Sequence, residues 1–340
     1  MNDINPVMPA AIGLDDGYAF TKVVLADGRF IAIPSRACIG RTGITWLEKA
    51  KQRVFEYETD DTVYSVGAVD GTATYFDEYP WSGLNRSIVQ HALKVAGLEG
   101  RSIHVVSGLP VSSFYLKNGE HRTDAIGKKC ESLKLPTRPL GSGLPASVAF
   151  HEVIPEALAA WYDDVIVEEG DGITLDADRI STPVAIVDIG GRTTDYVVVK
   201  DQGIIHGSSG SFQCGMLTVK QLVADGLQTL FDSEVISEQR IDSAVQNGVI
   251  RFQGTDHSVG KLVSNAKREV VERILFETRR QLGLGNELDR VLFVGGGAVA
   301  LAEYISDWFP HQATASHPAF ANARGMLKYL RYVCEASDAS

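Results

Sequence analysis

Short apolar runs separated by turn signals dominate the first part of the chain. They predict strands over 11–14, 20–25 and 30–33, which are separated by Asp15-Asp16-Gly17 and by Asp27-Gly28. Asp-Gly between apolar residues is typical of a tight turn, so these three strands are expected to be antiparallel. Further along, apolar positions recur with helical spacing over 85–96, and a buried strand is predicted over 103–106.

The second half of the chain carries the same mixture of patterns. Strands are predicted over 184–187, 196–199 and 291–294, and helices over 217–230, 261–282 and 320–332. The segment 147–161 is also predicted to be helical, with a bend or break at Pro155, because proline interrupts helical hydrogen bonds. The segment 163–178 carries seven acidic residues and no cation, and we expect a solvated loop between domains there.

One strand–turn–strand pattern occurs twice. Ile12-Gly-Leu-Asp15-Asp-Gly17 and Ile186-Val-Asp188-Ile-Gly190 each place an aspartate after an apolar strand, then a glycine and a second apolar strand. The two aspartates are 173 positions apart, about half the length of the chain. This repeat predicts two related domains, each beginning with a β-hairpin whose turn carries an aspartate.

The composition of these turns suits a phosphate site. A glycine turn lets backbone N–H groups approach a phosphate closely, and an aspartate at the end of a strand can hold the waters of Mg²⁺. Either hairpin alone is typical of a surface turn, but the pair, followed by Lys22 and by Thr193, Thr194 and Asp195, favours two turns gripping a triphosphate. Gly295-Gly296-Gly297 after a strand fits close approach to a ligand or, equally, the start of a helix.

Composition and charge narrow the classes of function. The 340 residues are 44% hydrophobic, which is ordinary for a globular protein, and no apolar run approaches the length of a membrane span. The net charge of −11 argues against direct coating of nucleic acid, although contact through a basic partner stays possible. Four widely spaced cysteines and no visible signal peptide predict a cytoplasmic protein with free thiols.

Five segments, in order, resemble the motifs of the actin-like ATPases, the superfamily of actin, sugar kinases, the seventy-kilodalton heat-shock chaperones and MreB. The segments are IGLDDGYAFTK (12–22), GSGLPASVAFHE (141–152), AIVDIGGRTTDYVV (185–198), VLFVGGGA (291–298) and ARGMLKYL (323–330). Within the superfamily, IVQHALKVAGLEGRSIHVVSGLPVSSFY (88–115) is similar to the ParM/StbA plasmid-segregation actins.

The resemblance implies an α/β fold of the actin-like (ribonuclease-H-like) type, with two related domains around a nucleotide cleft. Domain I is expected over 10–180, completed by a C-terminal helix over 318–335, and domain II over 181–317. It also implies ATP (or GTP) with Mg²⁺, and an ATPase that forms filaments and drives plasmid DNA segregation. Its partners are then other copies of itself and a basic DNA-binding adaptor at a centromere-like site, with no direct nucleic-acid or membrane contact.

Roles carry over residue by residue from the resemblance. Asp15 and Asp188 are expected to orient Mg²⁺ through water, and Asp195 to lie near the attacking water. The residues expected at the nucleotide are Gly17, Tyr18, Ala19, Lys22, Gly190, Gly191, Thr193, Gly215, Lys267, Arg268, Gly295, Gly296 and Gly297. Lys267 and Arg268 also fit a solvated helix face. Arg192 replaces a residue that is often small, which tightens the site or adds a phosphate contact.

The first connecting motif departs from the family. There ParM has a Glu and actin a Gln that positions the attacking water, and alignment on Leu144-Pro145-Ala146 puts Ser142 in that place. Slow hydrolysis, or a base drawn from Asp195, is therefore expected. Two alternatives stay open: a nucleotide-gated scaffold with little turnover, which Ser142 favours, and a monomeric small-molecule kinase, for which we find no acceptor pocket with a catalytic aspartate.

Overall fold

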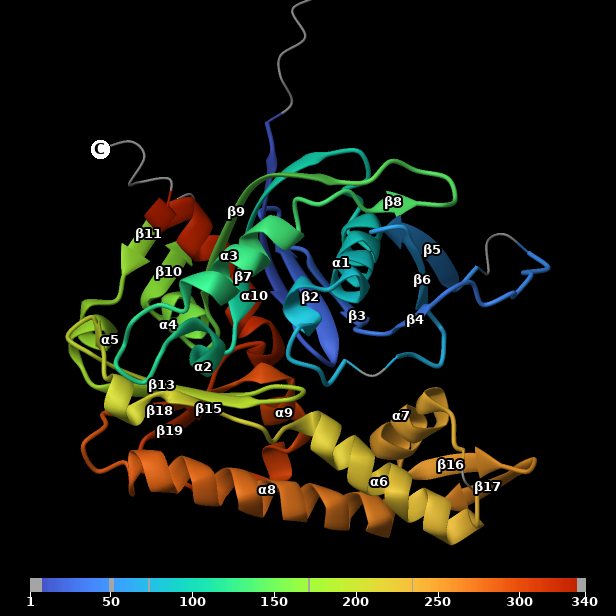
Figure 1. Cartoon of the computed structure of the whole chain (residues 1–340). Helices are drawn as coiled ribbons and strands as arrows, with labels where there is room; N and C mark the ends of the chain where they lie inside the picture. Colours follow the sequence, from blue (N-terminus) through green and yellow to red (C-terminus); the bar gives the residue numbers. More distant parts are fainter. Residues whose placement is uncertain (1–7, 49–51, 73, 171, 234, 335–340) are drawn as a thin grey trace, which may run out of the picture.

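Two β-sheets form the framework of the chain in the computed structural model, which describes residues 8–48, 52–72, 74–170, 172–233 and 235–334 (Figure 1). The first sheet has the strand order β3-β2-β1-β7-β9. As the opening hairpin predicts, β1 pairs antiparallel with β2, and it pairs parallel with β7. The strands are β1 (Ala10–Asp16), β2 (Phe20–Leu25), β3 (Phe30–Pro34), β7 (Ser102–Leu109) and β9 (Ser147–Pro155).

The second sheet repeats this plan. Its order is β14-β13-β12-β18-β19, and β15 also pairs with β13. Because β12 pairs antiparallel with β13 and parallel with β18, the structure contains the predicted repeat. The strands are β12 (Val184–Ile189), β13 (Thr194–Lys200), β14 (Gly203–Ile204), β15 (Gly210–Phe212), β18 (Arg290–Val294) and β19 (Gln312–Thr314).

A four-stranded sheet of order β4-β6-β5-β8 packs against α1 (Gly83–Val95) beside the first sheet. The helix begins at Ser82, whose side chain accepts a hydrogen bond from the backbone N–H of Asn85, as a helix cap should. The small strands are β4 (Ala37–Ile39), β5 (Val54–Thr59), β6 (Thr62–Gly67) and β8 (Arg138–Pro139). Two separate hairpins are β10 (Ile166–Glu169) with β11 (Gly172–Leu175), and β16 (Val249–Phe252) with β17 (Thr255–Ser258).

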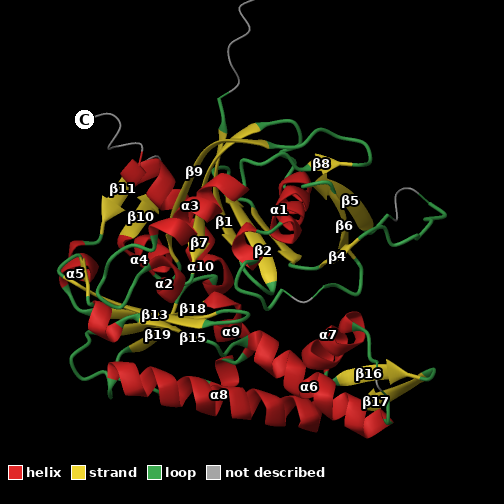
Figure 2. Cartoon of the chain, viewed as in Figure 1, coloured by secondary structure: helices red, strands yellow, loops and turns green. Residues whose placement is uncertain are grey.

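Helices cover both faces of the second sheet (Figure 2). On β12, Val187 and Ile189 pack into one core with α6 (Met216–Phe231) and α8 (Gly260–Leu282), whereas Ile186 faces the other way, toward α4 (Leu158–Val165). This explains why the strand is apolar at nearly every position rather than alternating. The remaining helices are α2 (Val111–Phe114), α3 (Thr123–Ser132), α5 (Ala177–Ser181), α7 (Glu238–Asn247) and α9 (Gly295–Ala300). No helix in the described part of the chain is long and apolar enough to cross a bilayer.

The last helix, α10 (Ala321–Tyr329), returns to the first sheet and packs between β1 and α4. A Cβ atom on Gly13 would lie 1.8 Å from the carbonyl oxygen of Ala323, and one on Gly325 would lie 1.6 Å from that of Ala159. Both contacts therefore require glycine. The proposed boundaries at 180 and 317 stay predictions, since α4 contacts both sheets, and residue 335 lies outside the described residues.

The predicted helix over 147–161 is wrong. Residues 147–155 form β9, which pairs with β7 along its length, and only from Leu158 does the chain turn into α4. Over Ser147–Phe150 the side chains alternate between more and less exposed positions, which is the period of a strand, and the rest of β9 is mostly buried. Partnership with β7 decides the outcome, because an apolar run of this length suits either element.

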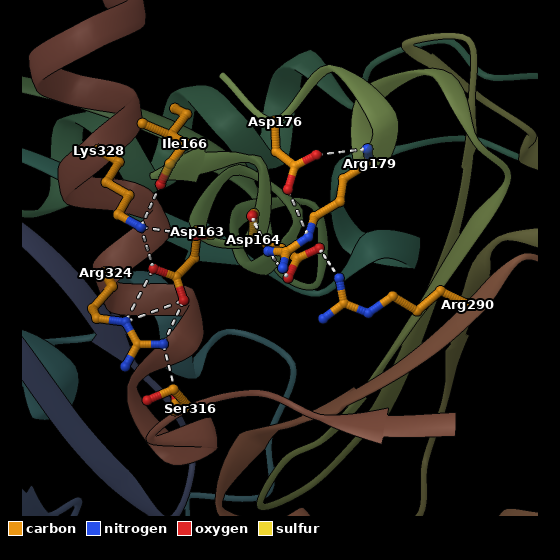
Figure 3. Close-up of polar contacts among 9 residues, drawn as sticks. All are labelled: Asp163, Asp164, Ile166, Asp176, Arg179, Arg290, Ser316, Arg324 and Lys328. Carbon is orange, nitrogen blue, oxygen red and sulfur yellow. Dashed lines mark hydrogen bonds and ion pairs between the residues drawn. The ribbon is translucent and has the colours of Figure 1, made fainter. Parts of the chain in front are cut away.

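The acidic segment is not simply a solvated loop between domains. It includes the end of α4, the β10–β11 hairpin and the start of α5, and the side chains of its first two aspartates are nearly buried. Asp163 forms ion pairs with Arg324 and Lys328 of α10 (Figure 3). Asp164 forms ion pairs with Arg179 of α5 and with Arg290 of β18. The neutralising cations come mainly from distant parts of the sequence.

Candidate functional site

The turns that follow β1 and β12 line one cavity of about 650 Å³, a size typical of cofactor sites. From the first turn and its strands come Asp15, Gly17, Tyr18, Ala19 and Lys22, and from the second come Asp188, Gly190, Gly191, Arg192 and Thr193. The two predicted phosphate turns thus meet at a single cavity. Side chains of α6, α7 and α8 and the start of α9 complete its walls.

The two turns approach each other at Gly191 and Ala19. A Cβ atom added to Gly191 would lie 2.6 Å from the Cβ of Ala19 and 2.9 Å from its backbone nitrogen. Real Cβ atoms do not come so close, and therefore only glycine permits this approach. The second turn is closed by a 2.9 Å hydrogen bond from the N–H of Gly190 to the carbonyl of Thr193. The result is a pair of narrow turns whose backbones border the cavity.

Each turn presents an aspartate held by a specific partner. In the first, Lys22 donates a 2.8 Å hydrogen bond to Asp15, and these residues are direct cross-strand neighbours in the β1–β2 hairpin. In the second, the side-chain amide of Asn322 on α10 donates a 2.7 Å hydrogen bond to Asp188. Asn322 also accepts a 3.1 Å hydrogen bond from the backbone N–H of Ala157, just before α4. The carboxylate of Asp188 is therefore fixed by both connecting helices.

Two further carboxylates line the cavity and were missed by the sequence analysis, Asp242 of α7 and Glu156. Glu156 directly follows β9, and its backbone N–H donates a 2.8 Å hydrogen bond to the carbonyl of Leu109 at the end of β7. Like Asp15 and Asp188, Glu156 lies at the C-terminal end of a strand of one of the two main sheets. That position was a usable signal, but it was hidden because the segment was taken to be a helix.

Burial and neighbouring carboxylates raise the pKa of two carboxyl groups in the cavity, Asp188 and Glu156. Burial, together with the nearby Asp15 and Asp195, raises the pKa of Asp188 to about 7. Burial and the charges of Asp195, Asp15 and Asp188 raise the pKa of Glu156 well above its usual value. Burial disfavours the charge of Lys22, but Asp15 outweighs it, and the pKa of Lys22 ends above its usual value.

This donor set fits Mg²⁺. Asp15, Asp188 and Glu156 converge in the cavity, and Lys22, which is paired with Asp15, does not keep the pKa of Asp188 and Glu156 from rising. Mg²⁺ takes oxygen ligands, commonly one or two carboxylates with several retained waters, and it compensates their negative charge. Asp15 and Asp188 face the cavity from opposite turns, as a water-mediated site requires.

Comparison with known proteins places this geometry in a family. Residues 12–165 match the model described as plasmid segregation protein ParM, N-terminal, and residues 186–307 match that described as archaeal actin homologue MreB-like, C-terminal. The two matches cover both strand–turn–strand repeats. The chain belongs to the actin-like superfamily.

Full-length relatives support the same conclusion. An archaeal actin homologue of Thermoplasma volcanium is 25% identical over 92% of this chain and 96% of its own length, and that of Thermoplasma acidophilum is 24% identical with the same coverage. Among solved structures, a crystal structure of an archaeal actin homologue has a TM-score of 0.71 at 19% identity, covering 97% of this chain and 100% of its own. A 15-stranded ParM filament from Clostridium botulinum has a TM-score of 0.74 at 18% identity, covering 95% and 99%. These likenesses give the actin-like fold.

In this actin-like chain, several other predicted residues reach the cavity. Lys267 of α8 and Gly296 and Gly297 of α9 line it beside the turns. A Cβ atom on Gly297 would lie 2.2 Å from the side chain of Ile189, and therefore α9 needs glycine there to pack on β12. Arg268 does not line the cavity and is exposed on the next position of α8, the solvated face that the sequence left open.

Three predicted residues lie behind the cavity wall. Gly295 has φ +88°, and a Cβ there would lie 2.1 Å from a carboxylate oxygen of Asp188. Gly215 precedes α6 and packs against the carbonyls of the second turn. Asp195 is buried and accepts hydrogen bonds from the Val111 N–H at 2.7 Å and from the hydroxyls of Thr193 and Ser211. Its carboxylate is occupied by these donors.

The structure does not place Ser142 in the cavity. Ser142 is exposed and lines a separate hollow on the small sheet, where Lys94 contacts its carbonyl at 3.4 Å. Ser142 therefore does not reach the place that the alignment through Pro145 gave it, whereas Glu156, fourteen residues later, lines the cavity. The argument that drew a base from Asp195 loses its basis with this correction.

Proposed function

We propose that this actin-like protein binds ATP (or GTP) with Mg²⁺ in the cavity, hydrolyses it, and forms nucleotide-dependent filaments that segregate plasmid DNA. One observation carries the proposal: two glycine turns from related sheets meet around Asp15, Asp188 and Glu156. The comparisons lend support, because relatives of the same fold are described as a ParM filament, an archaeal actin homologue in complex with ADP, and a Bacillus thuringiensis ParM with AMPPNP.

Each cavity residue then has a role in binding or catalysis. Backbone N–H groups of the two turns bind phosphate oxygens, and Lys22 adds a positive charge beside them. Asp15 and Asp188 hold the waters of Mg²⁺, which neutralises phosphate charge when bound. Glu156 orients the attacking water and accepts its proton, a task helped by its raised pKa because a general base works best near the ambient pH.

The base and ribose are proposed to lie toward Lys267, Gly296 and Gly297. These residues and Gln246 of α7 line the part of the cavity formed by helices. Gly296 leaves room for a flat ring, since a Cβ there would meet no atom within 4 Å. Which base is preferred, adenine or guanine, is a matter for the binding experiment below.

Filament assembly would follow from closure of the two halves on nucleotide, because subunit contacts select one closed form. Head-to-tail contacts that do not close into a ring then produce a filament. The net charge of −11 favours a basic adaptor, acting in the cytoplasm, as the link to DNA. The scaffold alternative loses the support it had from Ser142, now that Glu156 supplies a carboxylate.

The test combines binding, turnover and assembly. Equilibrium binding of ATP and GTP with Mg²⁺, phosphate release, and sedimentation with ATP, ADP, a non-hydrolysed analogue or no nucleotide are measured on the wild-type chain and on Asp188→Ala. We expect turnover and sedimentation to require triphosphate and the variant to lose turnover. Equal sedimentation under all four conditions would reject nucleotide-dependent assembly, and wild-type turnover in the variant would reject the site.

A further inference from the structure

Arg192, on the second turn, reaches across the cavity to the other half of the molecule. Its guanidinium donates a 2.7 Å hydrogen bond to Asp77, which lies between β6 and the turn of helix at 79–81. The same guanidinium lies 5.1 Å from the ring centre of Tyr18 on the first turn. Only 14% of the Arg192 side chain is exposed. One side chain thus joins both phosphate turns and a loop of the small sheet.

A second ionic contact crosses between the halves at a neighbouring point. Arg36, between β3 and β4, forms an ion pair with Asp242 of α7, and Glu238 of the same helix lies 3.9 Å away. Lys220 of α6 supports these acids, at 2.8 Å from Asp242 and 3.0 Å from Glu238. Arg36 is the only member contributed by the first half, so the contact must break when the halves separate.

We propose that Arg192–Asp77 and Arg36–Asp242, the two bridges, are positioning contacts that hold the cleft closed and set how slowly nucleotide leaves it. The inference rests on the proposed function, since it concerns nucleotide in that cavity. A nucleotide enclosed between two halves leaves when they separate, and separation breaks both bridges. Each bridge therefore adds to the barrier for release while contributing little to the encounter with nucleotide.

The sequence analysis left two roles for Arg192, a tighter site or a direct phosphate contact. The geometry favours the first, because Asp77 and Tyr18 already engage the guanidinium. Tyr18 in turn packs against Tyr79, with ring centres 5.1 Å apart, which keeps its ring in place beneath the guanidinium. The experiment below distinguishes the second role, a direct contact of Arg192 with phosphate, from the first.

The cleanest variants are Asp77→Ala and Arg36→Met, because neither residue lines the cavity and methionine keeps the aliphatic stem of Arg36. Release of a fluorescent ATP analogue with Mg²⁺ is followed by stopped flow after addition of excess ATP. An exposed or partly exposed ion pair is worth roughly 0.2–1 kcal/mol, so we expect each variant to release the analogue about 1.4- to fivefold faster. In the double variant the two increases in release rate should multiply. The association rate constant should change less than about twofold.

Arg251→Ala is the matched control, since its ion pair with Asp256 is exposed and lies within the β16–β17 hairpin. It should release the analogue at the wild-type rate. Asp77→Arg should release it faster than Asp77→Ala, because two cations then face each other. Asp77→Arg with Arg192→Asp restores opposite charges, and we expect it to slow release again relative to Asp77→Arg alone.

Different results would reject the role proposed for the two bridges and the proposed function. If Arg192→Ala speeds release but Asp77→Ala and Arg36→Met do not, Arg192 acts on phosphate and the bridges are rejected. If the wild-type chain binds neither ATP nor GTP, the proposed function fails. In that case small-angle scattering of the nucleotide-free protein tests separately whether the two bridges hold the cleft closed. The double variant should have a larger radius of gyration than the wild type, and an unchanged radius would reject that role.

Discussion

The Nε–H of Arg324 donates one bifurcated hydrogen bond to both carboxylate oxygens of Asp163, at 3.0 and 3.1 Å, although the residues are 161 positions apart (Figure 3). The pair joins α4, which leads from the first sheet to the second, to α10, which leads back. Lys328 lies 2.9 Å from the same carboxylate, of which 7% is exposed. The two connecting helices are therefore joined by charges held largely away from water.

Asp163→Ala should destabilise the fold markedly. It leaves Arg324 and Lys328 without their anion, and breaking a buried pair costs about 3–5 kcal/mol; we expect about 3 kcal/mol because both cations keep some exposure. Urea unfolding at pH 7 measures the change. Asp124→Ala, which removes an exposed pair with Lys128, should cost less than about 1 kcal/mol. Equal losses of unfolding free energy in the two variants would show that the α4–α10 ion pair stabilises the fold no more than an exposed pair does.

Glu156→Gln should abolish most hydrolysis while preserving nucleotide binding. Glutamine keeps the size of the side chain but cannot accept the proton of the attacking water, and loss of a positioned base costs about 10²–10⁴ in rate. Removing one of several mutually repelling charges should also raise the unfolding temperature of the nucleotide-free protein. Phosphate release and analogue binding, measured together, separate these effects.

Ser142→Ala is the informative companion to this variant. Because Ser142 lies in a different hollow, its loss should leave phosphate release within about twofold of the wild type, a change of less than roughly 0.5 kcal/mol in the barrier. Activity lost in Ser142→Ala but kept in Glu156→Gln would return the water-positioning role to the sequence-based alignment.

The predictable part of this molecule is the part set by local pattern. The strands that carry Asp15 and Asp188 were found because an apolar run, an aspartate and a glycine turn are adjacent in sequence. The long helices were found within two residues of their ends, since α6 and α8 bury residues three or four positions apart. The phosphate turns and the two-domain repeat follow from these features, whereas the actin-like fold was implied by the resemblance of the five motifs.

The parts that the sequence did not reveal depend on partners far away along the chain. Glu156 reaches the cavity because β9 pairs with β7, and nothing within 147–161 specifies that pairing. Asp163 and Asp164 look like solvated charges until Arg324 and Arg290 are brought beside them. The bridge from Arg192 to Asp77 spans 115 positions and two sheets, and a turn sequence alone does not indicate it.

Gly191→Ala should weaken nucleotide binding with little effect on folding. The added methyl group would collide with Ala19 at 2.6 Å, which forces the two turns apart, whereas each half keeps its own core. Loss of about 1–3 kcal/mol, the usual cost of overpacking, corresponds to roughly five- to 150-fold weaker binding. Titration with a fluorescent analogue measures it. Gly207→Ala, where a Cβ meets no atom within 4 Å, is the control and should bind normally; equal affinity of both variants would mean that the turns do not close on the ligand.

Two buried histidines should make the protein lose stability in acid. Burial, with Lys94 nearby, lowers the pKa of His91 to about 4, and burial, with Lys129 nearby, lowers the pKa of His151 to about 4. Burial and Lys129 favour the neutral form of His151, whose Nδ1–H donates to the carbonyl of Cys130 at 3.1 Å while Nε2 accepts from Ser107 at 2.8 Å.

The sign follows from the unfolded chain, where a histidine titrates near about 6.5. Above that pH neither state is protonated and the full stability is present; as the pH falls from about 6.5 toward 4, only the unfolded state gains protons, and stability falls. Asp188 has the opposite effect over part of this range. Because its pKa in the folded protein is raised to about 7, the folded state gains this proton before the unfolded state does as the pH falls, and stability rises. A comparison of variants is therefore needed to isolate the histidines.

His151→Gln removes one titrating group from a buried position. Between pH 7 and pH 5 each histidine should cost the wild type about 2 kcal/mol, from 1.36 kcal/mol per pKa unit over about 1.5 units, and the variant should lose about 2 kcal/mol less than the wild type over that interval. Urea unfolding at pH 7, 6 and 5 gives these differences. His121→Gln changes an exposed histidine and should leave the wild-type pH dependence in place. Parallel curves for His151→Gln and the wild type would show that His151 is not held neutral in the folded protein.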